Sequence, residues 1–91
     1  MIRLNVFVKV SEKDRETVIA AARKLVAASL GDEGCIAYDI FESSTRRDVL
    51  MICETWRDET ALAAHQKAAH FVELVPQIQE LAEMKTESFV F

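Results

Sequence analysis

The chain has 91 residues, of which 51% are hydrophobic, and a formal net charge of -4 at pH 7. A chain of this length forms one small domain that buries only about 60–65% of its unfolded surface, so a partner subunit would extend a modest core. The negative charge, with no basic cluster longer than Arg46-Arg47, argues against nucleic acid as a partner. No apolar run approaches the roughly 20 residues that span a bilayer, and the N-terminal residues alternate like a strand, unlike a secretion signal.

The two cysteines indicate the cellular compartment in which the protein is expected. Cys35 and Cys53 fit no C-x-x-C pattern and occupy apolar-facing strand positions. Such cysteines are typical of buried free thiols in a reducing compartment. We therefore expect a soluble cytoplasmic protein with no membrane partner, made of a single domain over residues 1–91.

The first third of the chain predicts a strand followed by a helix. Residues 2–10 alternate with period two. One face carries Ile2, Leu4, Val6, Val8 and Val10, and the other carries Arg3, Asn5, Phe7 and Lys9. Ser11 and Asp14 have the spacing of a helix N-cap, and Gly31 is placed to end that helix. Its apolar stripe consists of Val18, Ala22, Leu25, Val26 and Leu30.

The rest of the chain predicts two strands, two helical stretches and a last strand. Residues 35–42 and 48–56 form the strands, joined by a polar hairpin, and Asp58 caps a helix that runs to about Lys67. The stripe of the next helical stretch consists of Phe71, Leu74, Val75, Ile78 and Leu81. Pro76 lies inside this stretch and is expected to kink or split it. Residues 85–91 alternate again and close the chain as a strand.

The element order predicts the fold. A βαββαβ order is that of an α+β, ferredoxin-like domain, an antiparallel four-stranded sheet with the helices on one face. The first and third strands are apolar on both faces, yet helices on one side cover only one of them. Because an exposed apolar face of this size is unusual on a monomer, we expect a homodimer packed through the sheet face.

Several short patterns in the second half resemble a known family. They are Glu54-x-Trp56, the acidic helix start Asp58-Glu59, Ala61-Leu62, His65, the pair His70-Phe71, and Gly34-Cys35-x-x-Tyr38. Together with the element order they resemble the antibiotic biosynthesis monooxygenase (ABM) family, which includes quinol monooxygenases. The resemblance implies a single ABM domain over almost the whole chain and a dimeric α/β-barrel-type assembly. It names no particular substrate.

Two residues are candidates for catalysis. His65 lies on the inner stripe of its helix, opposite Trp56, and a neutral imidazole can accept a phenolic or enolic proton near neutral pH. The alternative is a core histidine with satisfied hydrogen bonds. Asparagine is disfavoured in strands, so we expect Asn5 to have a specific structural or functional role. It either satisfies a neighbouring backbone group or binds a substrate oxygen, or oxygen-derived charge, in a pocket between sheet and helices.

Other residues are candidates for substrate binding in the same pocket. Trp56 ends the third strand, where it is either a core plug or a stacking wall. Glu54 shares the face of Trp56, and burial would raise its pKa unless a cation lies beside it. The alternative is a salt bridge or an exposed strand end. Tyr38 offers a hydroxyl, and Phe7 shares the face of Asn5. His70 lies on a different part of the helical wheel from the first histidine, unless the chain breaks between them.

The sequence predicts no cofactor. It has no GxGxxG, P-loop or G-x-S-x-G pattern and only two glycines, so a glycine-rich cradle for a flavin or dinucleotide is not expected. No Asp or Cys lies at ligand spacing from the histidines, so no metal is expected either. An oxygenase without a cofactor takes its electrons from the substrate, and needs a base, an anion-stabilising donor and a dry flat pocket. His65, Asn5 and Trp56 are expected to supply these three to a hydroxylated aromatic or quinol reacting with O2.

Three alternatives stay open. A relative within the resembled family, an isomerase of a small carbonyl signalling compound, shares the H-x-x-x-x-H spacing of His65 and His70. A dimer that binds a small molecule without turnover is the second. Haem degradation is the third and is disfavoured, because the stretch from Phe71 to Phe91 offers no histidine to bind haem.

Overall fold

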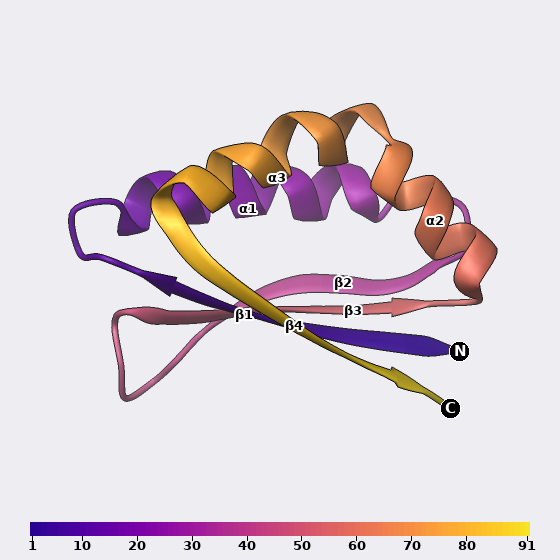
Figure 1. The fold of residues 1–91 in the computed structure, drawn as a ribbon, viewed down its shortest axis with the longest axis horizontal. Helices are drawn as coiled ribbons and strands as arrows, with labels where there is room; N and C mark the ends of the chain where they lie inside the picture. Colours follow the sequence, from indigo (N-terminus) through magenta and orange to yellow (C-terminus); the bar gives the residue numbers. More distant parts are fainter.

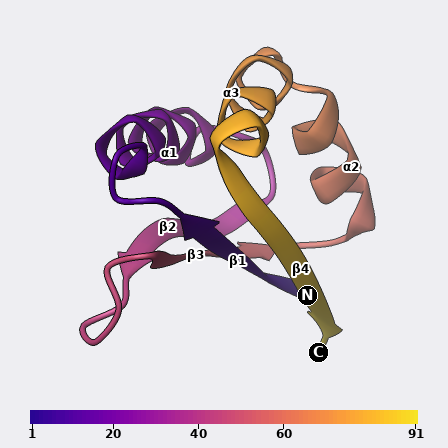
Figure 2. The ribbon, with the colours of Figure 1, turned by 60° about the vertical axis from the view of Figure 1, so that its left-hand side comes forward.

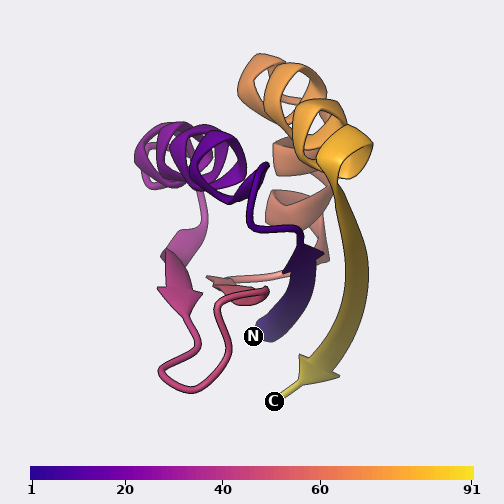
Figure 3. The same ribbon diagram turned by 90° about the vertical axis from the view of Figure 1, so that its left-hand side faces the viewer.

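Four strands and three helices make up the computed structural model, which describes residues 1–91. In chain order they are β1 (Ile2–Val10), α1 (Arg15–Ser29), β2 (Cys35–Glu42), β3 (Val49–Trp56), α2 (Glu59–Lys67), α3 (Ala69–Leu81) and β4 (Ala82–Val90). The strands form one sheet in the order β2-β3-β1-β4, and each neighbouring pair is antiparallel. All three helices lie on one face of this sheet (Figures 1 and 3). The predicted ferredoxin-like α+β fold is confirmed.

Strand alternation decides which side chains meet the helices. Along β1 the even-numbered residues are at most 9% exposed, and the register sets Ile2 opposite Trp56 and Leu4 opposite Glu54 on β3. These side chains join α1 and α3 in one core. The opposite face of the sheet has no helix over it (Figure 2). Its aromatic side chains are exposed: Phe7 by 43%, Phe41 by 50% and Phe89 by 49%.

The two helical stretches of the second half divide at an unexpected place. Ala68, with φ -66° and ψ 149°, is extended and separates α2 from α3, whereas α3 continues through Pro76. Pro76 was expected to kink or split the helix, and the split does not occur, because burial of Leu74, Val75 and Ile78 against the core holds the helix on both sides of the proline. No glycine or proline marks the break that does occur.

Smaller details of the fold also differ from the expectations. Asp14 precedes α1 without a capping hydrogen bond from its side chain; instead Ser11 Oγ donates to Asp14 Oδ2 at 3.2 Å. By contrast, Asp58 caps α2 as expected, since Ala61 N donates to its Oδ1 at 2.9 Å. β4 starts three residues earlier than the pattern suggested. None of the three helices has both the length and the apolar character needed to cross a membrane.

Candidate functional site

A cavity of about 360 Å³ lies between the sheet and the helices α2 and α3. Eight of its 13 lining residues are hydrophobic, contributed by β1, α1, β2, β3, α3 and β4. The other five are Glu54, His65, Gln66, Gln79 and Thr86, and Tyr38, one of the eight, adds a hydroxyl. A mostly apolar hollow with a few polar groups is the usual form of a site for a small molecule, and this volume falls in the lower part of the usual range.

His65 is the most confined polar residue of this cavity. Its side chain is 1% exposed, and its ring packs against Trp56 with a centroid separation of 4.4 Å. The rings of Tyr38 and Phe71 meet it edge-on at 5.4 and 5.2 Å. The contacts hold the imidazole on several sides, so its orientation is fixed by packing.

The two ring nitrogens of His65 have different surroundings. Nδ1 lies 2.8 Å from Asp32 Oδ2, whereas Nε2 is buried with no hydrogen-bond partner. Because an ionised carboxylate can only accept, Nδ1 carries the proton, and in the neutral ring Nε2 is a free acceptor. Burial lowers the pKa of His65, Asp32 opposes that effect, and His70 adds to it. The imidazole is therefore neutral at pH 7, as a general base must be.

Asp32 also joins the second histidine to the site. His70 Nε2 lies 2.8 Å from the same Oδ2 atom. On an unbroken helix, residues five apart point about 140° away from each other. The break at Ala68 removes that constraint, so the rings of His65 and His70 lie 5.8 Å apart.

The loop that carries Asp32 is fixed against α2 at Gly34. This glycine has φ +79°, and a Cβ there would lie 2.4 Å from the Cβ of Ala61. Its carbonyl accepts a hydrogen bond of 2.8 Å from Arg57 N. Only glycine allows the loop this conformation and this approach.

A second polar group lies where β2 and β3 meet the cavity. Glu54 is 5% exposed and accepts a hydrogen bond of 2.8 Å from Trp56 Nε1. Burial raises the pKa of Glu54, while hydrogen bonds from Trp56 and Tyr38 work in the opposite direction. Burial and the charge of Glu54 raise the pKa of Tyr38, so its hydroxyl keeps its proton. The carboxyl and the phenol can both bind a substrate oxygen.

The structure does not bring all the predicted residues together. Asn5 and Phe7 lie on the opposite face of the sheet, where Asn5 Nδ2 donates to Glu87 Oε1 at 3.1 Å. The expectation that Asn5 and Phe7 share the pocket of His65 was wrong, because helices cover the even-numbered face of β1 and both residues are odd-numbered. Trp56 is 0% exposed and lies behind His65, outside the cavity wall.

Some residues of the site were not found from the sequence. Asp32 is the principal one, and it gives the chain a cluster of two imidazoles and a carboxylate whose ligand atoms all lie within 4.8 Å of one another. The expectation of no acid at ligand distance from the histidines failed because sequence spacing does not measure distance across a fold. Gln66 and Gln79 were also missed, and nothing in their local sequence separates them from surface glutamines.

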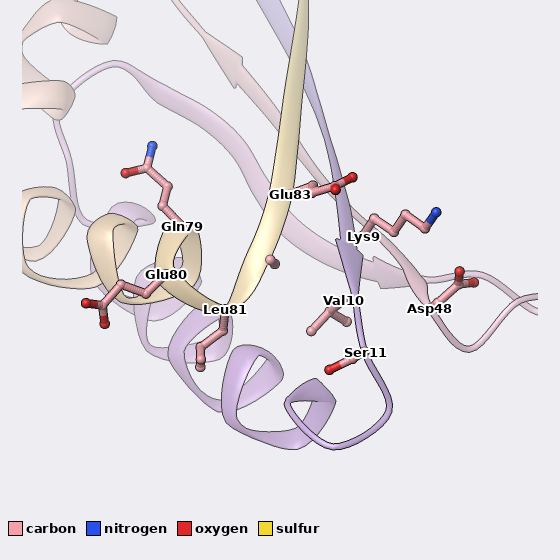
Figure 4. Close-up of a pocket in the computed structure, with 9 residues that line it drawn as sticks. Lys9, Val10, Ser11, Asp48, Gln79, Glu80, Leu81 and Glu83 are labelled. Carbon is pink, nitrogen blue, oxygen red and sulfur yellow. The ribbon is translucent and has the colours of Figure 1, made fainter.

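A larger hollow, of about 550 Å³, lies where β4 leaves α3 (Figure 4). Its charged residues, among them Lys9, Asp48 and Glu80, are exposed or half-buried and are spread around the rim in this view. It holds no buried titratable group, so it is a hydrated surface groove, and the cavity beside His65 is the better candidate site.

Fold and cavity together define a ferredoxin-like domain with a mostly apolar cavity beneath its helices. The model of a family described as "Antibiotic biosynthesis monooxygenase" matches residues 1–77. A protein of Bacillus subtilis (strain 168) named "Putative monooxygenase YcnE" is 36% identical over 81 residues, which are 89% of this chain and 85% of that protein. The chain belongs to the antibiotic biosynthesis monooxygenase family.

Two solved structures have the same fold as this chain. A protein of Bacteroides thetaiotaomicron VPI-5482, described as of unknown function and "Possible Oxidoreductase", is 67% identical with a TM-score of 0.97, covering 99% of this chain and 96% of that one. A conserved protein of Methanosarcina mazei Go1 is 26% identical with a TM-score of 0.92, covering 97% and 89%. The fold and the placement of its elements are thus shared with both proteins.

Proposed function

We propose that the chain is a cofactor-independent monooxygenase that oxidises a small hydroxylated aromatic or quinol with O2. The observation that carries this proposal is His65, a buried neutral imidazole at the cavity wall with Nδ1 held by Asp32 and Nε2 without a partner. An unpaired buried acceptor costs free energy in the empty site, and a substrate hydroxyl that donates to it would recover that cost.

The chemistry follows from that proton transfer. Nε2 takes the proton of the bound hydroxyl, and the electron-rich anion passes one electron to O2. The substrate radical and the superoxide formed in this step combine to a hydroperoxide, which loses water. For a quinol the balance is quinol plus O2 giving a hydroxyquinone plus water, so all four electrons come from the substrate. Asp32 stabilises the imidazolium that forms, as a carboxylate beside a catalytic histidine does.

Stabilisation of the anion needs a donor other than Asn5. The amides of Gln66 and Gln79 line the cavity and can donate without titrating. The phenol of Tyr38 lines it too, and its raised pKa keeps its hydroxyl a donor. Donors of this kind lower the barrier when they face the atom where charge develops.

Oxygen uptake tests the proposed reaction. With a panel of hydroquinones, naphthoquinols and anthrone-type phenols, we expect one O2 consumed per substrate and one ¹⁸O atom from ¹⁸O2 in the product. His65→Ala should lower kcat/KM by about 10²-fold, the low end for a positioned base. Lys67→Ala, an exposed change on the same helix, is the matched control and should keep the activity. No uptake with any member of the panel, or full activity in His65→Ala, would reject the proposal.

A non-oxidative isomerase is the second candidate. It is favoured by the two imidazoles, which lie 5.8 Å apart and share Asp32, an arrangement that could move a proton between carbons of a small carbonyl compound. Solvent deuterium incorporated into a carbonyl substrate, with no oxygen consumed, would favour this reaction. If neither reaction is seen but aromatic compounds still bind the cavity, the protein is a binding dimer without turnover.

We also propose that the whole chain is one ABM domain and that two copies pair through the uncovered sheet face. β4 extends the sheet beyond the matched residues and pairs with β1 along its length. The exposed rings of Phe7, Phe41 and Phe89 gather on that face. Light scattering at micromolar concentration should show a dimer, and Phe7→Asp should dissociate it. Val72→Asp places the same charge on an exposed position of α3 and should not.

A further inference from the structure

Three side chains of metal-binding type meet beside the cavity. Asp32 Oδ2 lies 2.8 Å from His65 Nδ1 and 2.8 Å from His70 Nε2, and the three atoms all lie within 4.8 Å of one another. Ligands held about 2.1 Å from a first-row ion lie roughly 3 to 4 Å apart. The two distances from Asp32 are just below that range and the distance between the two histidine nitrogens is at most 4.8 Å, so small side-chain movements would place all three atoms around an ion.

The cluster is assembled by tertiary structure. Asp32 lies in the loop before β2, His65 in α2, and His70 at the start of α3. Gly34 holds the loop against α2, and the break at Ala68 turns α3 so that its histidine faces the same carboxylate. Because these constraints belong to the fold, the three ligands are positioned before any ion binds.

Solvent reaches two of the three side chains of the cluster. The side chain of His65 is 1% exposed, whereas those of Asp32 and His70 are 19% and 21% exposed. Water can therefore complete the coordination beside Asp32 and His70. Three protein ligands with an open position are typical of catalytic rather than structural metal sites.

We propose that Asp32, His65 and His70 bind a divalent first-row transition-metal ion. Two imidazoles with one carboxylate suit Zn²⁺, Fe²⁺, Co²⁺ or Ni²⁺ and suit Mg²⁺ or Ca²⁺ poorly. The ion takes the Nδ1 position that a proton occupies in the metal-free protein. This site goes beyond the proposed oxidation, which needs no ion, and it gives the chain a second, metal-loaded state in which His65 is no longer the free base.

The only tryptophan of the chain reports on this site. Trp56 packs against His65 at 4.4 Å, so an open-shell ion at the cluster should quench its fluorescence. Tag-free protein is treated with EDTA, exchanged into chelator-free buffer and titrated with Co²⁺. We expect saturable 1:1 quenching with a d–d absorption band, reversed when Zn²⁺, a closed-shell ion, displaces Co²⁺. His70→Ala and Asp32→Asn should each weaken binding by at least about tenfold.

Two controls separate this cluster from other ligands. Glu33→Gln removes the exposed carboxylate next to Asp32, and Cys35→Ser with Cys53→Ser removes both thiols; all of these variants should bind Co²⁺ like the parent. Near-UV circular dichroism checks that each variant is folded, and His70→Gln replaces His70→Ala if that variant is not. Linear, unsaturable quenching would overturn the proposal. So would unchanged affinity in folded His70 variants, or binding lost only with the thiols.

The proposed oxidation and the proposed metal site can be rejected independently of each other. EDTA-treated protein that oxidises quinols but shows no saturable Co²⁺ binding would reject only the metal site. Protein that binds Co²⁺ through the cluster but consumes no oxygen in the metal-free state would reject only the cofactor-independent reaction.

Discussion

Replacing Asp32 by asparagine tests the role of the principal site residue that local sequence patterns did not reveal. The change keeps the shape of the side chain and removes its charge, in a loop that Gly34 also holds against α2. In the parent, one carboxylate oxygen lies 2.8 Å from each histidine. An amide cannot stabilise an imidazolium in the same way, because it brings a dipole where the carboxylate brings a full charge.

The size of the effect follows from the lost interaction. A hydrogen bond to a charged group contributes about 1.5–3 kcal/mol. That contribution grows as His65 gains a proton in the transition state, so its loss appears mainly in kcat. At about 1.4 kcal/mol per factor of ten, we expect a decrease in kcat of about 10- to 150-fold. Because Asp32 raises the pKa of His65 against the effect of burial, the same change should lower that pKa further.

Both effects can be measured on metal-free protein. Oxygen uptake gives kcat, and NMR titration of the imidazole resonances gives the pKa without any substrate. Glu33→Gln is the matched control, since it removes one carboxylate charge from the adjacent position, where the side chain is 90% exposed. It should change neither quantity. An Asp32→Asn variant with parental kcat and an unchanged His65 pKa would refute the assigned role of the carboxylate.

Three further predictions concern other parts of the account. Gly34→Ala should lower the free energy of unfolding by about 1–3 kcal/mol in urea titrations, because its Cβ would lie 2.4 Å from that of Ala61. Gly31→Ala is the control: there is room for its Cβ, so it should lower the free energy of unfolding by less. Equal losses in the two variants would contradict this prediction. In metal-free protein, the free energy of unfolding should fall as the pH drops below about 6.5, because the lowered pKa of His65 means that the unfolded state binds the proton more readily than the folded state. His65→Gln should make this dependence on pH less steep. A variant with the parental pH dependence would count against the assignment. Asn5→Ala should leave kcat within about twofold of the parent when the dimer is intact, as expected for a change on the far face of the sheet, and a large loss in an intact dimer would return Asn5 to the catalytic site.

The fold could be predicted because its signals are local. Alternation along residues 2–10 and 49–56 fixes which side chains face the helices, and the structure keeps that alternation without exception on the core side of β1. The element order then leaves few topologies for a small α+β domain. The burial of Glu54 was only one of the outcomes that its shared face with Trp56 allowed, the others being a salt bridge or an exposed strand end.

The site could be predicted only in part, because its geometry depends on tertiary packing. Whether Asn5 faces the pocket depends on which side of the sheet the helices cover. Periodicity shows only that Asn5 and Phe7 share a face, and the expectation assigned that face to the wrong side. The contact between Asp32 and His65 joins a loop to a helix 33 residues later, through a glycine whose close approach no local pattern reports. The break at Ala68 lies in a stretch with no glycine or proline, so it reflects the packing of α3 rather than a local signal.

A structure of the metal-free protein with a reduced hydroxylated aromatic, obtained without oxygen, tests the central claim most directly. The account predicts the ring in the cavity beneath α2 and α3, with a hydroxyl about 2.6–3.2 Å from His65 Nε2. A ligand bound on the uncovered face of the sheet, or in the cavity with every oxygen out of reach of that nitrogen, would contradict it.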